Sequence, residues 1–235
     1  MAFGKAFDGT DIYNAADIPE IDYLFITHDH WDHLDYKTIL ELKPKIRQVF
    51  CGLGVGAHLE YWGFNPDIIT EMDWDEKADV GDGFSIRSAT ARHFSGRGLN
   101  RDKALWLSFI LQTPNTNIFI GGDSGYDTHF KAIGEAFGPF DLVILENGQY
   151  NKKWKFSHMF PAQVLQAAKD LRAEQLLPVH SGKFKLAEHP WDEPLSEIVR
   201  LNTDDNLRLL TPKIGQKVLL SDTLQSFTNW WEGIE

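Results

Sequence analysis

The chain of 235 residues carries 34 acidic residues against 23 Lys and Arg, which gives a net charge of -11. Such an acidic surface repels phosphate backbones, so nucleic acid is disfavoured as a partner. The single cysteine, Cys51, excludes an internal disulfide and a cysteine-rich zinc ribbon, and no apolar run reaches the roughly eighteen residues of a membrane span. We therefore expect a globular protein of the reducing cytoplasm, without membrane insertion.

Short apolar strands alternate along the chain with amphipathic segments. Together they predict an α/β (α+β) fold with mixed sheets flanked by helices, as in a four-layer αββα sandwich. Pro and Asn between two of the strands supply the geometry of a hairpin turn. No repeat, linker or low-complexity tract divides the chain, so 1–235 is predicted to form one domain. Strands are predicted at 21–27, 46–51, 84–91, 104–113, 117–123, 140–146 and 175–180, and helices at 36–43, 56–63, 129–138 and 161–173.

A cluster of histidines and aspartates, "HDHWDH", follows directly after the first predicted strand. Open α/β sheets hold ligands at the carboxyl ends of their strands. Imidazole and carboxylate are suitable ligands for zinc and similar ions. The alternate residues His28 and His30 can face one centre, while Asp32 and His33 face a neighbouring one. A solvated, polar turn is the alternative interpretation.

Three other predicted strands also end in residues that bind metals. His93 follows the strand at 84–91, Asp123 ends the strand at 117–123, and His180 ends the strand at 175–180. Four strand ends thus offer seven potential ligands, and this repetition favours a metal site over a polar turn.

With these motifs in place, the sequence resembles the metallo-β-lactamase superfamily of hydrolases, whose signature His-x-His-x-Asp-His appears as "HDHWDH". It is most similar to the branch that contains N-acylphosphatidylethanolamine phospholipase D and ascorbate-phosphate lactonase. The segments "ARHFSGR", "GGDSGYDTHF", "HMFPAQ" and "PVHSGKF" follow in the family order. The resemblance covers roughly residues 21–194.

The resemblance implies a ligand set and a cofactor. His28, His30 and His93 would hold one metal, Asp32, His33 and His180 a second, and Asp123 would bridge the pair. Two divalent ions are implied, with zinc as the first choice and manganese or iron as alternatives.

The start of the chain departs from the family pattern. Family members usually have two or more strands before the histidine motif, whereas only residues 1–20 precede the first predicted strand here. We therefore expect the first N-terminal strands to be lacking. An exposed sheet edge would then invite pairing with a second copy, so a homo-oligomer is one expectation.

Two adjacent metal ions indicate hydrolysis. They lower the pKa of a bound water toward about 7 and so hold a bridging hydroxide as nucleophile at neutral pH. Two centres also suit displacement at phosphorus, so a phosphodiester is the first choice of substrate, either a small molecule or one derived from a lipid. The alternative is a lactone or other cyclic ester at the same site. A flavodiiron-type oxidoreductase and a non-catalytic metal-binding scaffold fit less well, because His30 stands where the former has glutamate and because all seven ligand positions are filled.

Further residues are predicted to act on the substrate. His158 precedes the helix at 161–173 and matches a family histidine, so with Asp123 it is predicted to be catalytic, as a donor to an oxyanion or a leaving group. A polar residue at a helix start is the alternative. Arg97 and Trp31 are predicted to bind substrate, although a solvated arginine and a core tryptophan are the ordinary alternatives. We assign His58, His129 and His189 to structure.

Overall fold

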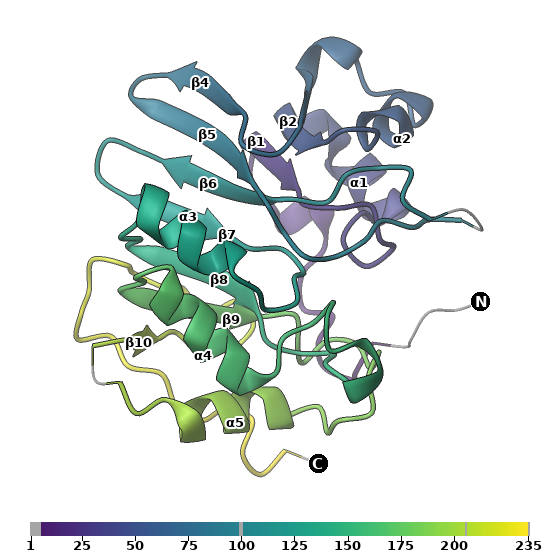
Figure 1. Ribbon diagram of the computed structural model, residues 1–235. Coiled ribbons are helices and arrows are strands. Elements are labelled where there is room, and N and C mark those ends of the chain that lie inside the picture. The colour runs from purple at the N-terminus through teal and green to yellow at the C-terminus, as the bar shows by residue number, and fades with distance from the viewer. Residues whose placement is uncertain (1–5, 99–100, 205, 235) are drawn as a thin grey trace.

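The computed structural model describes residues 6–98, 101–204 and 206–234. Its strands form two sheets that pack face to face (Figure 1). The smaller sheet consists of three parallel strands in chain order, β1 (Ile21–Ile26), β2 (Ile46–Gly52) and β3 (Ile69–Met72). Such parallel strands need crossover connections, and α1 (Tyr36–Leu42) and α2 (Gly56–Tyr61) supply them.

The larger sheet has seven strands in the order β10-β9-β8-β7-β6-β5-β4. The pairs from β4 to β7 are antiparallel and those from β7 to β10 are parallel, so β5, β7, β8 and β9 run in one direction. Their carboxyl ends therefore meet at one edge. The strands are β4 (Lys77–Gly81), β5 (Phe84–Ala89), β6 (Ser108–Gln112), β7 (Asn117–Ile120), β8 (Leu142–Glu146), β9 (Gln175–Val179) and β10 (Arg208–Leu209).

Helices cover the outer face of each sheet. In Figure 1, α3 (His129–Phe137), α4 (Pro161–Asp170) and α5 (Glu193–Leu201) lie over the larger sheet, and α1 and α2 flank the smaller one. Short 3-10 segments occur at Ala15–Asp17, Lys43–Lys45, Pro66–Ile68 and Lys152–Trp154.

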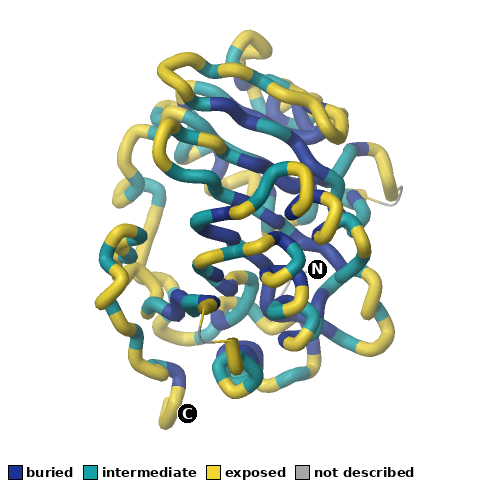
Figure 2. Tube along the Cα trace, turned by 60° about the vertical axis from the view of Figure 1, so that its left-hand side comes forward, coloured by how far each residue is buried: buried dark blue, intermediate teal, exposed yellow. Residues whose placement is uncertain are grey.

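Three clusters of buried apolar side chains hold these four layers together. One joins α3, α4 and α5 to the larger sheet, and a second joins α1 and α2 to the smaller sheet. The third lies between the sheets, where Phe50 of β2 and Phe109 of β6 have no exposed surface. Burial of each such side chain contributes about 2 kcal/mol. In Figure 2 the buried stretches follow the central strands. The predicted αββα sandwich is thus confirmed.

The predicted elements differ from the observed ones in a few places. Strands β3, β4 and β10 and helix α5 were not predicted. The strand predicted at 104–113 begins only at Ser108, because the preceding residues bond to the residues that directly follow β1 and β2 instead. The Leu105 N–H donates to the Leu53 carbonyl at 2.7 Å, and the Leu107 N–H donates to the Thr27 carbonyl at 2.9 Å. This segment therefore ties the two sheets together next to the histidine motif.

Within the described ranges, no helix combines the length and the apolar character that crossing a bilayer requires.

Candidate metal centre

The histidine motif occupies the loop between β1 and α1. This loop ends at Asp35, whose carboxylate accepts the Thr38 N–H at 2.8 Å and so caps the first turn of α1. Across from it, Asp123 follows β7 through two glycines. Gly122 has a φ of +61°, and a Cβ there would lie 2.7 Å from the Cβ of Thr27. Only glycine lets the end of β7 come this close to the end of β1, which brings Asp123 to the histidines.

Three histidines form the first half of the site. The Nδ1 atom of His30 lies 3.1 Å from Nε2 of His28 and 3.2 Å from Nε2 of His93. His28 and His30 come from the loop after β1, and His93 from the loop after β5. One nitrogen of each ring therefore faces a common point, as three ligands of one ion do.

The second half joins the same loop to the end of β9. Nε2 of His33 and Nε2 of His180 are 3.2 Å apart. The Asp32 carboxylate lies beside both, with Oδ2 3.5 Å from His33 Nε2 and 3.4 Å from His180 Nε2. His180 has a positive φ of 68°, a backbone conformation that is costly for a residue with a side chain and is found most often at functional sites.

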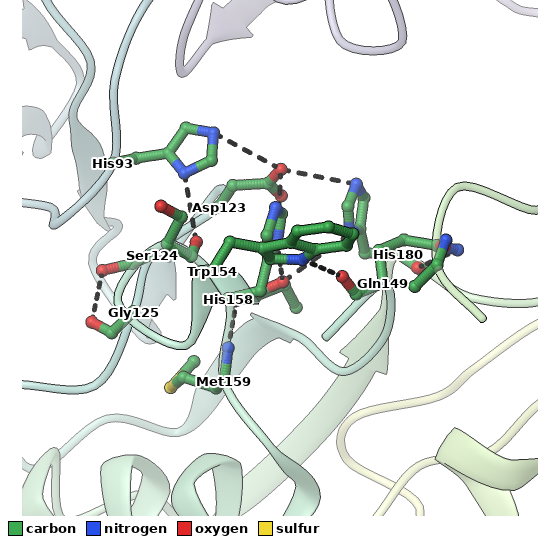
Figure 3. A network of polar contacts seen from close by, with 12 residues as sticks. His93, Asp123, Ser124, Gly125, Gln149, Trp154, His158, Met159 and His180 are labelled. Carbon is green, nitrogen blue, oxygen red and sulfur yellow. Dashed lines mark hydrogen bonds and ion pairs between the residues drawn. The ribbon is translucent and has the colours of Figure 1, made fainter. Parts of the chain in front are cut away.

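Asp123 lies between the two halves. Its Oδ2 atom is 3.2 Å from His33 Nε2 and 3.4 Å from His180 Nε2, and 3.8 and 3.9 Å from Nε2 of His28 and His93. Figure 3 shows this carboxylate between the rings of His93 and His180. The structure therefore brings together all seven residues that the sequence analysis singled out as potential ligands.

The far nitrogens of the rings also have partners. His28 Nδ1 lies 3.1 Å from Thr27 Oγ1, and His93 Nδ1 donates to the Ser157 carbonyl at 3.1 Å. A proton held on Nδ1 leaves Nε2 unprotonated and able to bind a metal, which is the usual arrangement for a ligating histidine. The donor set of imidazole nitrogens and carboxylate oxygens is of the kind that binds divalent metal ions such as zinc, manganese or iron.

The histidines of the site differ in the direction of their pKa shifts. Burial lowers the pKa of His28, and it lowers the pKa of His93 to about 3. Burial also lowers the pKa of His33, but the Asp123 and Asp32 carboxylates outweigh it and raise this pKa to about 9. Although burial opposes them, the imidazoles of His180 and His33 hold the pKa of Asp123 well below its usual range. Positive charge is therefore favoured on His33, which lies beside both carboxylates.

His158 lies beside this cluster, just before α4. Its Nδ1 atom is 2.7 Å from Glu146 Oε2 and 4.0 Å from Asp123 Oδ2. Burial lowers the pKa of His158, but the Glu146 carboxylate outweighs it, so the net shift is upward. The side chain keeps 14% of its surface exposed, so one side of the ring reaches solvent next to the ligands.

Arg97 and Trp31 lie together at the back of the histidine loop. The guanidinium carbon of Arg97 is 4.1 Å from the ring centre of Trp31 and 5.1 Å from that of Trp62. Its NH1 group donates to the backbone carbonyls of Asp29 and Leu34. The arginine thus holds the loop that carries the ligands, and Trp31 keeps 47% of its surface exposed.

Two buried carboxylates next to the histidines, Asp29 and Glu146, were not predicted from the sequence. Asp29 accepts the Gly96 N–H at 2.8 Å and lies 3.5 Å from His58 Nε2, so it joins the loops that carry the first three histidines. Glu146 ends β8 and contacts His158. The signal for Glu146 was present, because it ends an apolar strand just as Asp123 and His180 do.

The remaining histidines lie outside the cluster. His129 Nε2 is 3.2 Å from Ser124 Oγ, and burial lowers the pKa of His129 to about 4. His189 accepts the Gln149 N–H at 2.8 Å.

Comparisons with known proteins agree with this geometry. A family model described as a beta-lactamase superfamily domain matches residues 10–181. An uncharacterized protein of Mycobacterium tuberculosis is 40% identical over 92% of this chain and 59% of its own length. The N-acyl-phosphatidylethanolamine-hydrolyzing phospholipase D 1 of Caenorhabditis elegans is 32% identical over 72% of this chain and 51% of its own length.

The chain thus spans between half and three fifths of these curated relatives. Among solved structures, the isothiocyanate hydrolase from Delia radicum gut bacteria superposes with a TM-score of 0.67 at 18% identity, over 87% of this chain and 78% of its own, which shows likeness of fold. The family predicted from the motifs is confirmed, and the chain belongs to the beta-lactamase superfamily.

Proposed function

We propose that this chain is a metal-dependent hydrolase of phosphodiesters that works with two divalent metal ions, zinc being our first choice. The observation that carries this proposal is the arrangement of imidazole nitrogens from four histidines within 3.9 Å of a single Asp123 oxygen. Bound metal ions would supply a nucleophile at neutral pH, by lowering the pKa of a water, and would stabilise charge on the attacked group.

The side chains of the protein would hold the two ions and orient the ligand rings. His28, His30 and His93 would bind one ion and Asp32, His33 and His180 the other, with Asp123 between them. The negative charge of Asp123 would offset the charge of both ions, and the acceptors Thr27 and Ser157 fix two of the rings.

His158 is our proposed proton donor. It lies next to the seven ligands, and its net pKa shift is upward although burial lowers it, because the Glu146 carboxylate outweighs burial. A protonated imidazole at this place can donate to the leaving oxygen of a phosphodiester.

Trp31 and Arg97 remain our proposals for contacts with the substrate. Trp31 belongs to the same loop as His28, His30 and His33 and keeps 47% of its surface exposed. Because NH1 of Arg97 is already bonded to the loop, a phosphate would have to be met by its other nitrogens.

A phosphodiester is favoured over a cyclic ester by the relatives named as phospholipases D, which cleave such a bond and are 32 to 33% identical to this chain. The organic part of the substrate is proposed to be a small molecule or a lipid derivative. We also propose that the enzyme acts in the cytoplasm, because its buried Cys51 is unpaired, and that residues 1–235 form one domain, because no repeat or linker divides the sequence.

The test combines metal analysis with a panel of chromogenic substrates. We expect two equivalents of zinc, manganese or iron per chain, and hydrolysis of phosphodiesters in preference to phosphomonoesters and lactones. Preferred cleavage of lactones would replace the phosphodiesterase by a cyclic-ester hydrolase. Failure to bind metal would refute the proposal altogether.

A further inference from the structure

Glu146 is a carboxylate with no exposed surface at the end of β8, and it is not among the seven proposed ligands. Its Oε1 atom accepts the Met159 N–H at 2.7 Å, and its Oε2 atom accepts from His158 Nδ1 at 2.7 Å. Burial of a carboxylate is costly unless such partners satisfy it. The rigid backbone amide fixes the side chain, so Oε2 has a defined direction.

The same oxygen also faces a second imidazole. Glu146 Oε2 lies 3.6 Å from His180 Nδ1, and this nitrogen is buried without a hydrogen-bond partner among the described residues. The opposite nitrogen of that ring, Nε2, faces Asp32, His33 and Asp123. The rings of His158 and His180 are almost parallel, at 7° with centres 5.5 Å apart, and the Nδ1 atoms of both lie next to the same Glu146 oxygen.

An imidazole that binds a metal through Nε2 carries its proton on Nδ1, and this proton needs an acceptor. His28 and His93 have neutral oxygens at that position, from the Thr27 hydroxyl and the Ser157 carbonyl. For His180, the group in position to accept is the Glu146 carboxylate. A charged acceptor supports the ligand more strongly than a neutral one.

We propose that Glu146 is a positioning residue that orients two histidines at once: it presents His180 Nε2 to one of the two metals and fixes the ring of the proton donor His158. The inference rests on the proposed metal site. It also predicts an asymmetry, since only the metal held by Asp32, His33 and His180 depends on Glu146. The metal held by His28, His30 and His93 does not.

The Glu146→Gln variant keeps the size and one acceptor oxygen for the Met159 N–H, but turns an amide NH₂ group toward both rings. His180 then has a donor where it needs an acceptor. In a zinc titration against a competing chelator, we expect one site to keep its affinity within about twofold and the other to weaken by about 10- to 100-fold. Asp170→Asn is a matched control, because that carboxylate also accepts two hydrogen bonds, from Tyr126 and Gln166, away from the cluster. It should leave both sites unchanged.

A second measurement on the unaltered protein covers the case in which Glu146→Gln fails to fold. The ¹⁵N NMR shifts of the zinc-loaded protein report which ring nitrogen carries the proton, and we expect Nδ1–H on both His158 and His180. An unprotonated Nδ1 on either ring, or a proton on Nε2 of His180, would overturn the inference, as would equal weakening, or no weakening, of the two sites in Glu146→Gln. A wild-type chain that binds no zinc would instead refute the proposed function itself.

Discussion

Asp123 offers one oxygen to four imidazoles, at distances between 3.2 and 3.9 Å. Without its negative charge, two dications would face one another and a set of neutral rings. For Asp123→Asn we therefore expect metal occupancy and hydrolysis both to fall, activity by about a hundredfold or more.

Metal content and kcat measured on the same preparation check this prediction. Asp127→Asn is the control, since Asp127 belongs to the same loop but pairs with Arg92 at 2.8 Å, outside the cluster. Wild-type activity in Asp123→Asn would place the chemistry elsewhere in the chain.

His158 gives a second prediction, because it adjoins the ligands without being one of them. His158→Ala should keep its metal content and lose about 10²- to 10³-fold in kcat, the usual cost of one donor to the developing charge. The loss should shrink for a nitrophenyl phosphodiester, whose leaving group needs no proton. An equal loss for activated and unactivated esters would favour the lactonase alternative, and no loss at all would leave His158 a polar residue at a helix start.

At the scale of elements, the two sheets meet through an apolar layer in which Phe109 of β6 packs against Phe25 of β1, with ring centres 5.0 Å apart. Phe109→Ala leaves a cavity there and should lower the free energy of unfolding by about 3 to 5 kcal/mol. Urea denaturation measures the change. Leu224→Ala, at a side chain that is 91% exposed, should stay within about 0.5 kcal/mol of the wild type.

Some of the strands could be predicted from the sequence and others could not. Long apolar runs such as β8, in which Leu142, Val143 and Leu145 are all buried, were predicted because burial on both faces leaves a continuous pattern. The strand β4 was not predicted, because only alternate residues of it are partly buried. No apolar run precedes the turn at Asp82 and Gly83, which links β4 to β5. The sequence also held no sign that Glu146 would contact His158, because that contact depends on how the loop before α4 folds back over β8.

At the scale of the whole molecule, the candidate metal centre takes its side chains from loops of both sheets, so a bound metal would stabilise the packing of one sheet on the other. Metal binding would also be linked to the release of protons from the histidines. In the metal-free protein His33, with a pKa of about 9, carries a proton at pH 7. A metal needs that nitrogen unprotonated, so binding should release about one proton from this ring, and affinity should rise with pH until about 9. Zinc calorimetry in buffers of different ionisation enthalpy measures the release. Affinity that does not change between pH 7 and 9 would contradict it.

The order along the chain has a consequence for synthesis. His30 and His93 are 63 residues apart, whereas Asp32 and His180 are 148 residues apart. Because a chain leaves the ribosome from its N-terminus, the three histidines of the first half are all present well before β9 has been made. On the proposed ligand assignment, the newborn chain would offer one metal position early and the other only after most of the larger sheet can form, so two ions would be acquired in sequence, the first one while the protein is still unfinished.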